Sequence, residues 1–333
     1  MSRIFRSDDV QVGDRVVARR DFGDVHSDVI GHVLSLKPLV IRPQQVGGYP
    51  SDLEAVEIAP EQLKIIKRLS PRMVRNSDIR AVEYATAQAF PGKEHTWTAD
   101  GSWLMRAGDG VTGRSNSAVP LGPSAGFNPV PVEEITEFYR RHDLPVRLLI
   151  PERIGKPAER LLADATWHTE PEILVMVLRD LADLSAEAPG SHPSGAEFRI
   201  DAQPDDAWLQ MYHFRGQALP AEALEYLRAR IEGTMGFGRL VIDGETVAIT
   251  RGTITESGDG TAWLGYSAVE VAPAHRRQGL GALLGQHMLR WGREQGAKHA
   301  YLDVLASNTA GIRLYEKLGF IEQHRQIYAR LRD

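Results

Sequence analysis

The strongest constraint on the fold is a stretch in which an apolar strand runs through a glycine-containing turn into a long helix, Val271-Ala-Pro-Ala-His-Arg276-Arg277-Gln278-Gly279-Leu280-Gly281-Ala282. Backbone N–H groups at the start of a helix have no partner within the helix, and the helix dipole places partial positive charge there. Gly279 and Gly281 have no Cβ, so an anion can come close to the backbone. The stretch therefore predicts a cradle for a pyrophosphate. Because such turns are also common as purely structural features, a second motif has to support this prediction.

The second motif lies further along the chain, where residues 301–308 predict a strand and a polar turn, and residues 311–320 predict a short helix that ends in glycine. From about Phe198 to Arg330, the two motifs together resemble the GNAT superfamily of acyl-CoA-dependent N-acetyltransferases. The resemblance implies an α/β (α+β) fold with a mixed sheet and acetyl-CoA as the co-substrate.

The glycine turn carries the most specific part of this resemblance. Arg276, Gly279 and Gly281 match the Arg-x-x-Gly-x-Gly loop of the superfamily, whose backbone amides hold the pyrophosphate of coenzyme A. The strand before it would pair with the pantetheine arm as if with an added strand. The resemblance thus implies these coenzyme-binding residues: Val269, Glu270, Val271, Arg276, Arg277, Gln278, Gly279, Leu280, Gly281, Ala282, Asn308 and Tyr315.

Asn308 and Tyr315 match the superfamily signature Asn-x-x-Ala-x-x-Leu-Tyr-x-x-x-Gly-Phe, which implies that Asn308 steadies the pantetheine and that Tyr315 lies beside the thioester sulfur. Gly311 departs from the signature by replacing its alanine, at a cost of about 0.5–1 kcal/mol in a helix. A phenol with the ordinary pKa of about 10 can donate a proton to a thiolate whose pKa is about 8.5. We therefore predict that Tyr315 is the general acid. The alternative is a helix-face aromatic residue that only packs on the sheet.

Two carboxylates are candidates for the general base. Asp303 and Glu270 lie in apolar strand runs, where burial raises the pKa of a carboxyl group. Asp303 precedes Tyr315 at the spacing where some N-terminal-amine acetyltransferases of the superfamily carry a glutamate base, so we rank it first. In the alternative interpretation, either carboxylate pairs with a basic neighbour such as Arg276 or Lys298.

Tyr266, acting through an ordered water, is a third candidate base, whereas His275 and His299 are predicted to be surface residues of a turn and of a strand entry. The acceptor itself is not readable from the sequence. If it were glutamate, cations should line its pocket to receive two carboxylates, with these candidates: Arg215, Arg239 and Arg251.

Length and composition limit the alternatives. A chain of 333 residues that is 42% hydrophobic predicts two to three domains with real cores. The absence of cysteine excludes disulfides, thiolate zinc sites and cysteine nucleophiles, and no metal is expected. The sequence shows no signal-peptide core and no apolar run of about 18 residues, so we predict a cytoplasmic protein without a membrane partner. The net charge of −5 argues against nucleic acid as a partner.

The chain divides into regions of different character, which we predict to be domains. Residues 1–70 hold short β-branched runs that resemble a Src-homology-3-like barrel, with a closing turn at 61–67. Residues 71–185 resemble a degenerate GNAT-like domain, because they lack both motifs. Residues 186–196 form a linker rich in Pro, Ser and Gly, and residues 197–333 form the active GNAT domain. This tandem arrangement is similar to that of an actinobacterial group.

Within the degenerate domain, the periodicity predicts helices at 78–89, 132–142 and 160–165, and strands at 103–106, 146–151 and 173–178. Its one polar cluster, Arg114-Ser-Asn-Ser-Ala, either lines a site or forms a strand edge, and the second interpretation is favoured. We predict that each chain binds one acetyl-CoA and that the catalytic domain binds it.

The overall prediction is an enzyme that transfers the acetyl group of acetyl-CoA to a primary amine, either of a small amino acid such as glutamate or of a protein. A different class of function is a non-catalytic acyl-CoA-binding regulator whose barrel docks a partner. The intact Asn308 and Tyr315 favour the enzyme. The oligomeric state is not readable.

Overall fold

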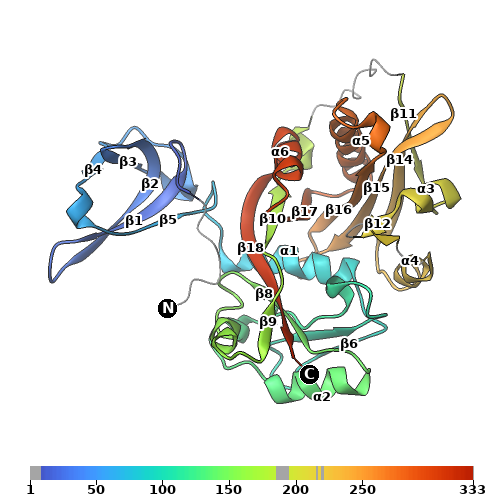
Figure 1. The fold of residues 1–333 in the computed structure, drawn as a ribbon, viewed down its shortest axis with the longest axis horizontal. Coiled ribbons are helices and arrows are strands. Elements are labelled where there is room, and N and C mark those ends of the chain that lie inside the picture. Colours follow the sequence, from blue (N-terminus) through green and yellow to red (C-terminus); the bar gives the residue numbers. More distant parts are fainter. Residues whose placement is uncertain (1–8, 185–194, 215–216, 219–220, 333) are drawn as a thin grey trace. The chain divides into compact units, whose positions relative to one another are not determined.

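The computed structural model describes residues 9–184, 195–214, 217–218 and 221–332 (Figure 1). Most of the predicted linker, at 186–194, and the predicted cation Arg215 lie outside these residues. The chain divides into two compact units, one made of Met1–Arg75 with Ile321–His324 and the other of Asn76–Phe320 with Arg325–Asp333.

The N-terminal unit contains an antiparallel sheet of five strands in the order β4-β3-β2-β1-β5. The strands are β1 (Arg15–Asp21), β2 (His26–Leu36), β3 (Leu39–Pro43), β4 (Val56–Ile58) and β5 (Leu63–Arg68). Its core is made of small and β-branched side chains on one face, among them Val16, Ala18, Val33 and Ile41.

The structure of this unit differs from two of the predictions made from the sequence. The sheet is unclosed, because β4 and β5 form its two edges, so the predicted barrel is not confirmed. The predicted turn at 61–67 is wrong: a short 3-10 turn, η2 (Pro60–Gln62), leads straight into β5, which pairs with β1. The reason is that Leu63 and Ile66 pack against the core, which pulls the segment into the sheet.

The first half of the second unit follows the predicted order of elements. It contains α1 (Asn76–Ala89), β6 (Glu94–Trp97), β7 (Leu104–Ala107), α2 (Val132–Arg141), β8 (Arg147–Pro151), β9 (Trp167–Thr169) and β10 (Ile173–Leu178). The predicted helix at 160–165 is instead a 3-10 helix, η5 (Ala158–Ala163), which starts after Pro157.

The second half carries both motifs on the elements that the sequence predicts. Its elements are β11 (Glu197–Asp201), α3 (Asp206–Met211), β12 (His213–Phe214), β13 (Gln217–Ala218), α4 (Ala221–Arg228), β14 (Thr234–Ile242), β15 (Glu245–Glu256), β16 (Ala262–Val271), α5 (Leu280–Glu294), β17 (His299–Leu305), α6 (Thr309–Lys317) and β18 (Ile321–Leu331). Asp243 and Gly244 both have positive φ angles, of 51° and 85°, as the tight turn between β14 and β15 requires.

One mixed sheet runs through both halves, in the order β11-β14-β15-β16-β17-β10-β18-β8, with β9 also paired to β18. Strand β10, from the first half, lies between β17 and β18 of the second half. The last strand in turn pairs with β8 and β9 of the first half. Because the halves share hydrogen-bonded strands, they form one sheet, and their division at 185–197 stays a prediction.

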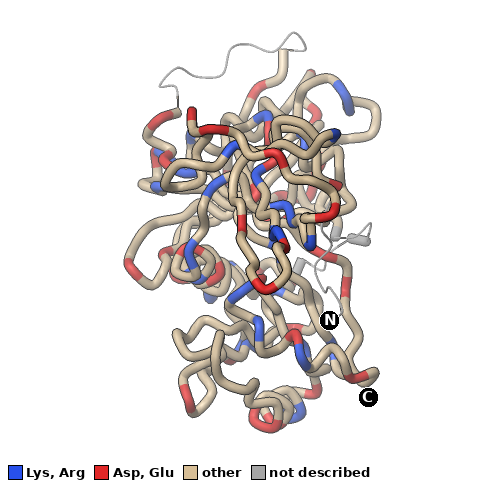
Figure 2. Tube along the Cα trace, turned by 90° about the vertical axis from the view of Figure 1, so that its left-hand side faces the viewer, with Lys and Arg blue, Asp and Glu red and all other residues tan. Residues whose placement is uncertain are grey.

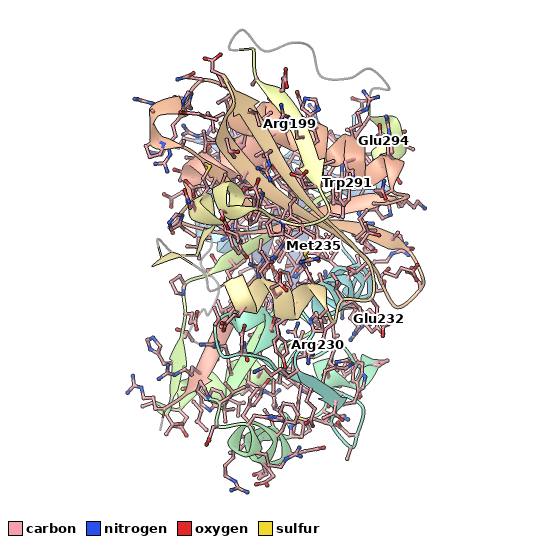
Figure 3. All side chains as sticks on the ribbon, turned by 90° about the vertical axis from the view of Figure 1, so that its right-hand side faces the viewer. Arg199, Arg230, Glu232, Met235, Trp291 and Glu294 are labelled. Carbon is pink, nitrogen blue, oxygen red and sulfur yellow. The ribbon has the colours of Figure 1, made fainter. Side chains whose placement is uncertain are left out.

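The two faces of the sheet carry different helices. Helix α5 packs on one face, where Met288 belongs to the same buried cluster as Leu264 and Leu302 and Trp291 packs against that cluster. On the opposite face, Phe237 and Ile249 form a cluster with Trp208 and Leu224 of α3 and α4, and Met235 packs against it. Figure 3 labels Trp291 and Met235, which thus belong to the cores on the two faces. Helix α1 also contacts β15, since Thr255 Oγ1 donates to the Ala85 carbonyl at 2.8 Å.

Membrane spans, metal ligands and the distribution of charge concern the whole described part of the chain. No helix in it combines the length and the apolar character that a membrane span requires. Within the same residues, no group of three or more His, Asp or Glu side chains is placed to hold a metal ion. Lys and Arg are interspersed with Asp and Glu along the trace (Figure 2).

Candidate active site

The site begins where two parallel strands of the sheet separate. Strands β16 and β17 pair only over Trp263–Gly265 and His299–Tyr301. Beyond Gly265, β16 continues to Val271 and stays paired with β15 on its other side. The edge of β16 from Tyr266 to Val271 therefore faces an opening in the sheet, and it includes the residues predicted to pair with pantetheine.

A β-bulge lies in β16 at this opening. Between Ile249 and Arg251 the register with β15 shifts, so that β16 contains one residue more than its partner. Ala268, within the bulge, has a positive φ of 57°. A non-glycine residue in this conformation stores strain of order 1 kcal/mol or more, and such strain is concentrated at functional sites. The extra residue of β16 is left unpaired in the ladder with β15, beyond the point where the pairing with β17 ends.

The predicted pyrophosphate loop follows directly from the end of β16. It consists of a 3-10 turn, η7 (Pro273–His275), exposed residues at 276–279 and the start of α5. Arg277 and Gly279 have positive φ angles of 62° and 86°, which a chain needs to wrap its N–H groups around an anion. Ala282 N donates to the Gly279 carbonyl at 3.0 Å, so the exposed Gly279 is the N-cap from which α5 begins.

Glu270 lies at the end of β16, beside this loop. Its carboxylate forms an ion pair with Arg276, with 2.7 Å between Arg276 Nη2 and Glu270 Oε1. Arg276 Nε also donates to the Val271 carbonyl at 2.9 Å. The structure thus places Glu270 and Arg276 together as a brace between β16 and the loop.

Tyr315 lies on α6, half-buried against the face of the sheet that carries α5. Its ring packs edge-on against Tyr266, with 6.0 Å between the ring centroids, and against Phe320 at 6.2 Å. Burial raises the pKa of Tyr315 to about 12, so its phenol is protonated throughout the neutral range. Burial raises the pKa of Tyr266 as well. Both phenols can donate a proton at neutral pH, whereas neither is ionised.

Asn308 forms the cap at the start of α6. Its Oδ1 accepts a hydrogen bond from the Gly311 N–H at 2.9 Å, which leaves Nδ2 as a donor. A Cβ at position 311 would lie 2.8 Å from that Nδ2. The close approach gives a physical reason for glycine at the position where the superfamily signature has alanine.

Asp303 lines a cavity of about 310 Å³ on the face of the sheet opposite α5. It lies on β17, paired with Val175 of β10. The cavity is also lined by Arg114 of the first half and by Tyr328 of β18, beside the ion pair of Arg147 with Glu170, whose atoms are 3.4 Å apart. Asp303 and Tyr315 thus lie on opposite faces of the sheet, beside its opening.

A second cavity, of about 130 Å³, borders the bulge itself. Its described lining includes Ala268 of the bulge, Arg251 of β15, Phe90 after α1 and Tyr212 after α3. Thr112, Arg114 and His213 line both cavities, which therefore adjoin.

Solved structures of other proteins share this fold. A GCN5-related N-acetyltransferase from Kribbella flavida has a TM-score of 0.57 and 20% identity, and the match covers 78% of this chain and 96% of that one. A tandem GNAT protein from the clavulanic acid biosynthesis pathway has a TM-score of 0.54 and 18% identity, covering 75% of this chain and 86% of that one. These likenesses support the tandem GNAT fold.

Sequence comparison decides the family. The model of the family described as "Probable histone acetyltransferase Rv0428c C-terminal" matches residues 76–329. A protein of Mycobacterium tuberculosis named "Probable histone acetyltransferase Rv0428c" is 34% identical over 318 residues, which are 94% of this chain and 93% of that protein. The chain belongs to the GNAT-type acetyltransferases. Acetyltransferases of this family take the acetyl group from acetyl-CoA.

Several residues of this GNAT acetyltransferase differ from their predicted placement. His299 is buried rather than at the surface, because its Nδ1 accepts from the Asp180 N–H at 3.0 Å. Arg239 does not line either cavity in the described structure, because it forms ion pairs with Asp201 at 2.9 Å and Asp205 at 2.7 Å. Arg251, in contrast, lines the cavity at the bulge.

The sequence interpretation missed other residues that line the cavities of the candidate site. Arg114 was expected on a strand edge, yet it lines both cavities. Its polar neighbours in the sequence were the available signal: Asn116 Oδ1 accepts from the N–H groups of Gly108 and Gly110, at 2.8 and 3.0 Å, and so braces the loop that carries Arg114. His213 and the bulge at Ala268 had no signal in the sequence.

Proposed function

We propose that this GNAT acetyltransferase transfers the acetyl group of acetyl-CoA directly to a primary amine, either of a small amino acid such as glutamate or of a protein or peptide. One observation supports the proposal most. The pairing of β16 with β17 ends at Gly265, next to the bulge at Ala268, and the same strand leads into the exposed turn at 276–279 before α5. A thioester arm along the edge of β16 would reach from an anion site to a cavity that can hold an amine.

The turn before α5, the edge of β16 and Asn308 offer the hydrogen-bonding groups that coenzyme A needs. The exposed turn at 276–279, with its two positive φ angles, and the start of α5 would hold the pyrophosphate through backbone N–H groups. The edge formed by Val269–Val271 would pair with the pantetheine amides, and Asn308 Nδ2 would donate to the same arm. Bound there, acetyl-CoA would supply the acetyl group as a reactive thioester.

The side chains around the opening can assist each proton movement. The new N–C bond forms as the C–S bond breaks, so the amine loses one proton and the thiolate gains one. Tyr315 would donate to the sulfur, and a backbone N–H of the bulge would polarise the carbonyl oxygen. Asp303 would accept the proton of the amine. Holding the amine next to the thioester supplies much of the rate enhancement.

Among the carboxylates, Asp303 fits the role of base better than Glu270. Asp303 lines the larger cavity, where an amine has room to bind. Glu270 already forms an ion pair with Arg276 at the coenzyme loop, and it does not line either cavity in the described structure. We therefore assign Glu270 to bracing the coenzyme loop.

Release of free coenzyme A from acetyl-CoA tests the proposed activity. A panel of primary amines, with and without carboxylates, should include at least one that raises the rate of thiol release well above the rate of acetyl-CoA hydrolysis. If no amine in a broad panel does so while acetyl-CoA still binds, the alternative of a non-catalytic acyl-CoA-binding regulator would replace the enzyme. The acetyltransferase relatives do not favour that alternative.

The pyrophosphate assignment predicts a loss of coenzyme affinity when position 281 becomes acidic. We expect Gly281→Glu to weaken coenzyme A binding at least tenfold, about 1.4 kcal/mol, because the carboxylate repels the pyrophosphate. An acidic residue in the first helical turn does not itself destabilise a helix. A Cβ at this position would lie 3.2 Å from Leu314, so thermal unfolding should confirm that the variant is folded. Calorimetric titration measures the affinity.

Gln286→Glu is the matched control, since it adds the same charge on the exposed side of α5 beyond its first turn. This control should bind coenzyme A like the wild type. If a folded Gly281→Glu variant and the control bound coenzyme A with equal affinity, the loop before α5 would not be the pyrophosphate site.

We also expect one acetyl-CoA per chain, because only the second half contains the turn at 276–281 and the capped helix α6. Calorimetry with acetyl-CoA should give a stoichiometry of one. Two equivalents would show that the first half, through the loop around Arg114 and Asn116, also binds the coenzyme.

A further inference from the structure

The two cavities on the acceptor side of the sheet carry a pair of arginines whose role the proposed activity does not explain. Arg251 is only 2% exposed and lines the smaller cavity, and Arg114 lines both cavities. Both guanidinium groups lie over the ring of Phe90, with Cζ at 5.3 Å and 4.1 Å from its centroid. Two cations thus converge on one aromatic ring at the wall of a cavity.

The hydrogen-bond partners of Arg251 within the described part of the chain are neutral. Its Nε donates to Ser267 Oγ and its Nη1 to the Tyr212 hydroxyl, both at 3.2 Å. Among the described residues, no carboxylate forms an ion pair with Arg251 or Arg114. Arg239, on the neighbouring strand, is a useful contrast, since two aspartates neutralise it. A buried cation without an anion is costly, so a structural role alone does not account for Arg251.

The surroundings add to the positive potential. Burial lowers the pKa of Arg251, and the charge of Arg114 contributes in the same direction. The acidic residue on the described lining of the smaller cavity is Asp109, which is exposed and accepts from the Val111 N–H at 2.9 Å. A bound anion would relieve the repulsion between the two arginines and would complete the charge balance.

We propose that Arg251 and Arg114 bind a carboxylate of the acceptor, which makes the acceptor a free amino acid or a similarly small amine that carries a carboxylate. Guanidinium groups bind carboxylates in pairs of parallel hydrogen bonds, and both cavities adjoin at Arg114. This inference rests on the proposed function, and it assigns part of the acceptor site to the first half of the unit.

The position of the pair also orients such an acceptor. A carboxylate held by the two arginines beside Ala268 would leave the amine within the space between the bulge and Asp303. The amine would attack the thioester carbon, Asp303 would take its proton, and the carboxylate would stay bound through the reaction. A protein lysine side chain brings no carboxylate to this pair, so it would leave both cations without a partner.

Equilibrium binding of amino acids tests the inference without any need for turnover. A set of L-amino acids, glutamate among them, is titrated into the full chain beside the matching α-amides, and a lysine-containing peptide with both ends blocked is included. We expect the best amino acid to bind at least tenfold more tightly than its α-amide, with the blocked peptide weaker still. Arg114→Gln should reduce that preference to about twofold or less, and Arg251→Lys should reduce it in the same direction.

Arg141→Gln is the matched control, because Arg141 is also a cation over a phenyl ring of the first half, at 5.6 Å from the centroid of Phe138. The control should keep the wild-type preference for the amino acid. The inference is overturned if the wild type binds the amide or the blocked peptide as well as the amino acid, or if folded Arg114→Gln keeps the full preference. Because these are binding measurements, a protein that prefers carboxylates yet releases no coenzyme A would contradict the proposed activity alone.

Discussion

Replacing Tyr315 by phenylalanine is expected to lower kcat roughly 10²–10⁴-fold, while the affinity for acetyl-CoA is preserved. The aromatic ring would keep its contacts with Tyr266 and Phe320, so α6 would stay in place. What is lost is the hydroxyl group that donates to the departing sulfur. Steady-state kinetics of thiol release measure kcat, and calorimetry measures the affinity.

The height of the pH–rate profile distinguishes proton donation by Tyr315 from a role in packing alone. Because the pKa of Tyr315 is raised to about 12, the phenol is protonated at every pH at which a protein of this kind is normally assayed. The Tyr315→Phe variant should therefore lower the pH–rate profile of the wild type without changing its shape. Tyr49→Phe, which removes a hydroxyl group from the N-terminal unit, should leave the profile at its wild-type height. A Tyr315→Phe variant with wild-type kcat would leave the tyrosine a packing residue.

The local elements of the site could be predicted from the sequence because each is encoded by neighbouring residues. Gly279 fixes the point at which the chain turns into α5, and Asn308 caps α6 through its own side chain. Helical spacing of Leu284, Met288 and Trp291 predicts the buried face of α5, where all three pack.

Features that depend on distant segments could not be predicted in this way. The insertion of β10 between β17 and β18 depends on pairing between segments from both halves, for which periodicity within one segment carries no information. Arg114 and Arg251 also come from segments far apart in the sequence and lie over the same ring, that of Phe90. The bulge at Ala268 was missed because alanine, unlike glycine, does not mark a positive φ. Residues 1–70 were predicted to form a barrel, which the open sheet does not confirm, because short β-branched runs predict strands but not closure.

The charge pattern also shows why sequence alone misplaces acceptor residues. Arg239 and Arg251 both lie on strands of the same sheet, and nothing in the neighbouring sequence separates them. In the structure, Asp201 and Asp205 pair with Arg239, whereas Arg251 faces a cavity. Candidate binding cations can therefore be ranked only after their partners in space are known.

The second large effect is expected for Asp303→Asn, which should lower kcat/KM roughly 10²–10⁴-fold with an acceptor amine that carries no carboxylate. Asparagine keeps the size of the side chain on the cavity wall but cannot accept a proton at neutral pH. Asp183→Asn, an exposed change near the end of β10, should leave the rate unchanged. Glu270→Gln should act mainly through a higher KM for acetyl-CoA, since its carboxylate pairs with Arg276.

The acidic side of the pH profile then identifies the base. Two groups must lose a proton for the reaction, the amine of the acceptor and the carboxyl group of Asp303. Between their pKa values, log kcat/KM should rise with a slope of one as the pH increases, and below both it should rise with a slope of two. The Asp303→Asn variant contains only the amine, so its slope should stay at one throughout. If wild type and Asp303→Asn share the same profile, Asp303 is not the base, and Glu270 or a water held by Tyr266 would have to accept the proton.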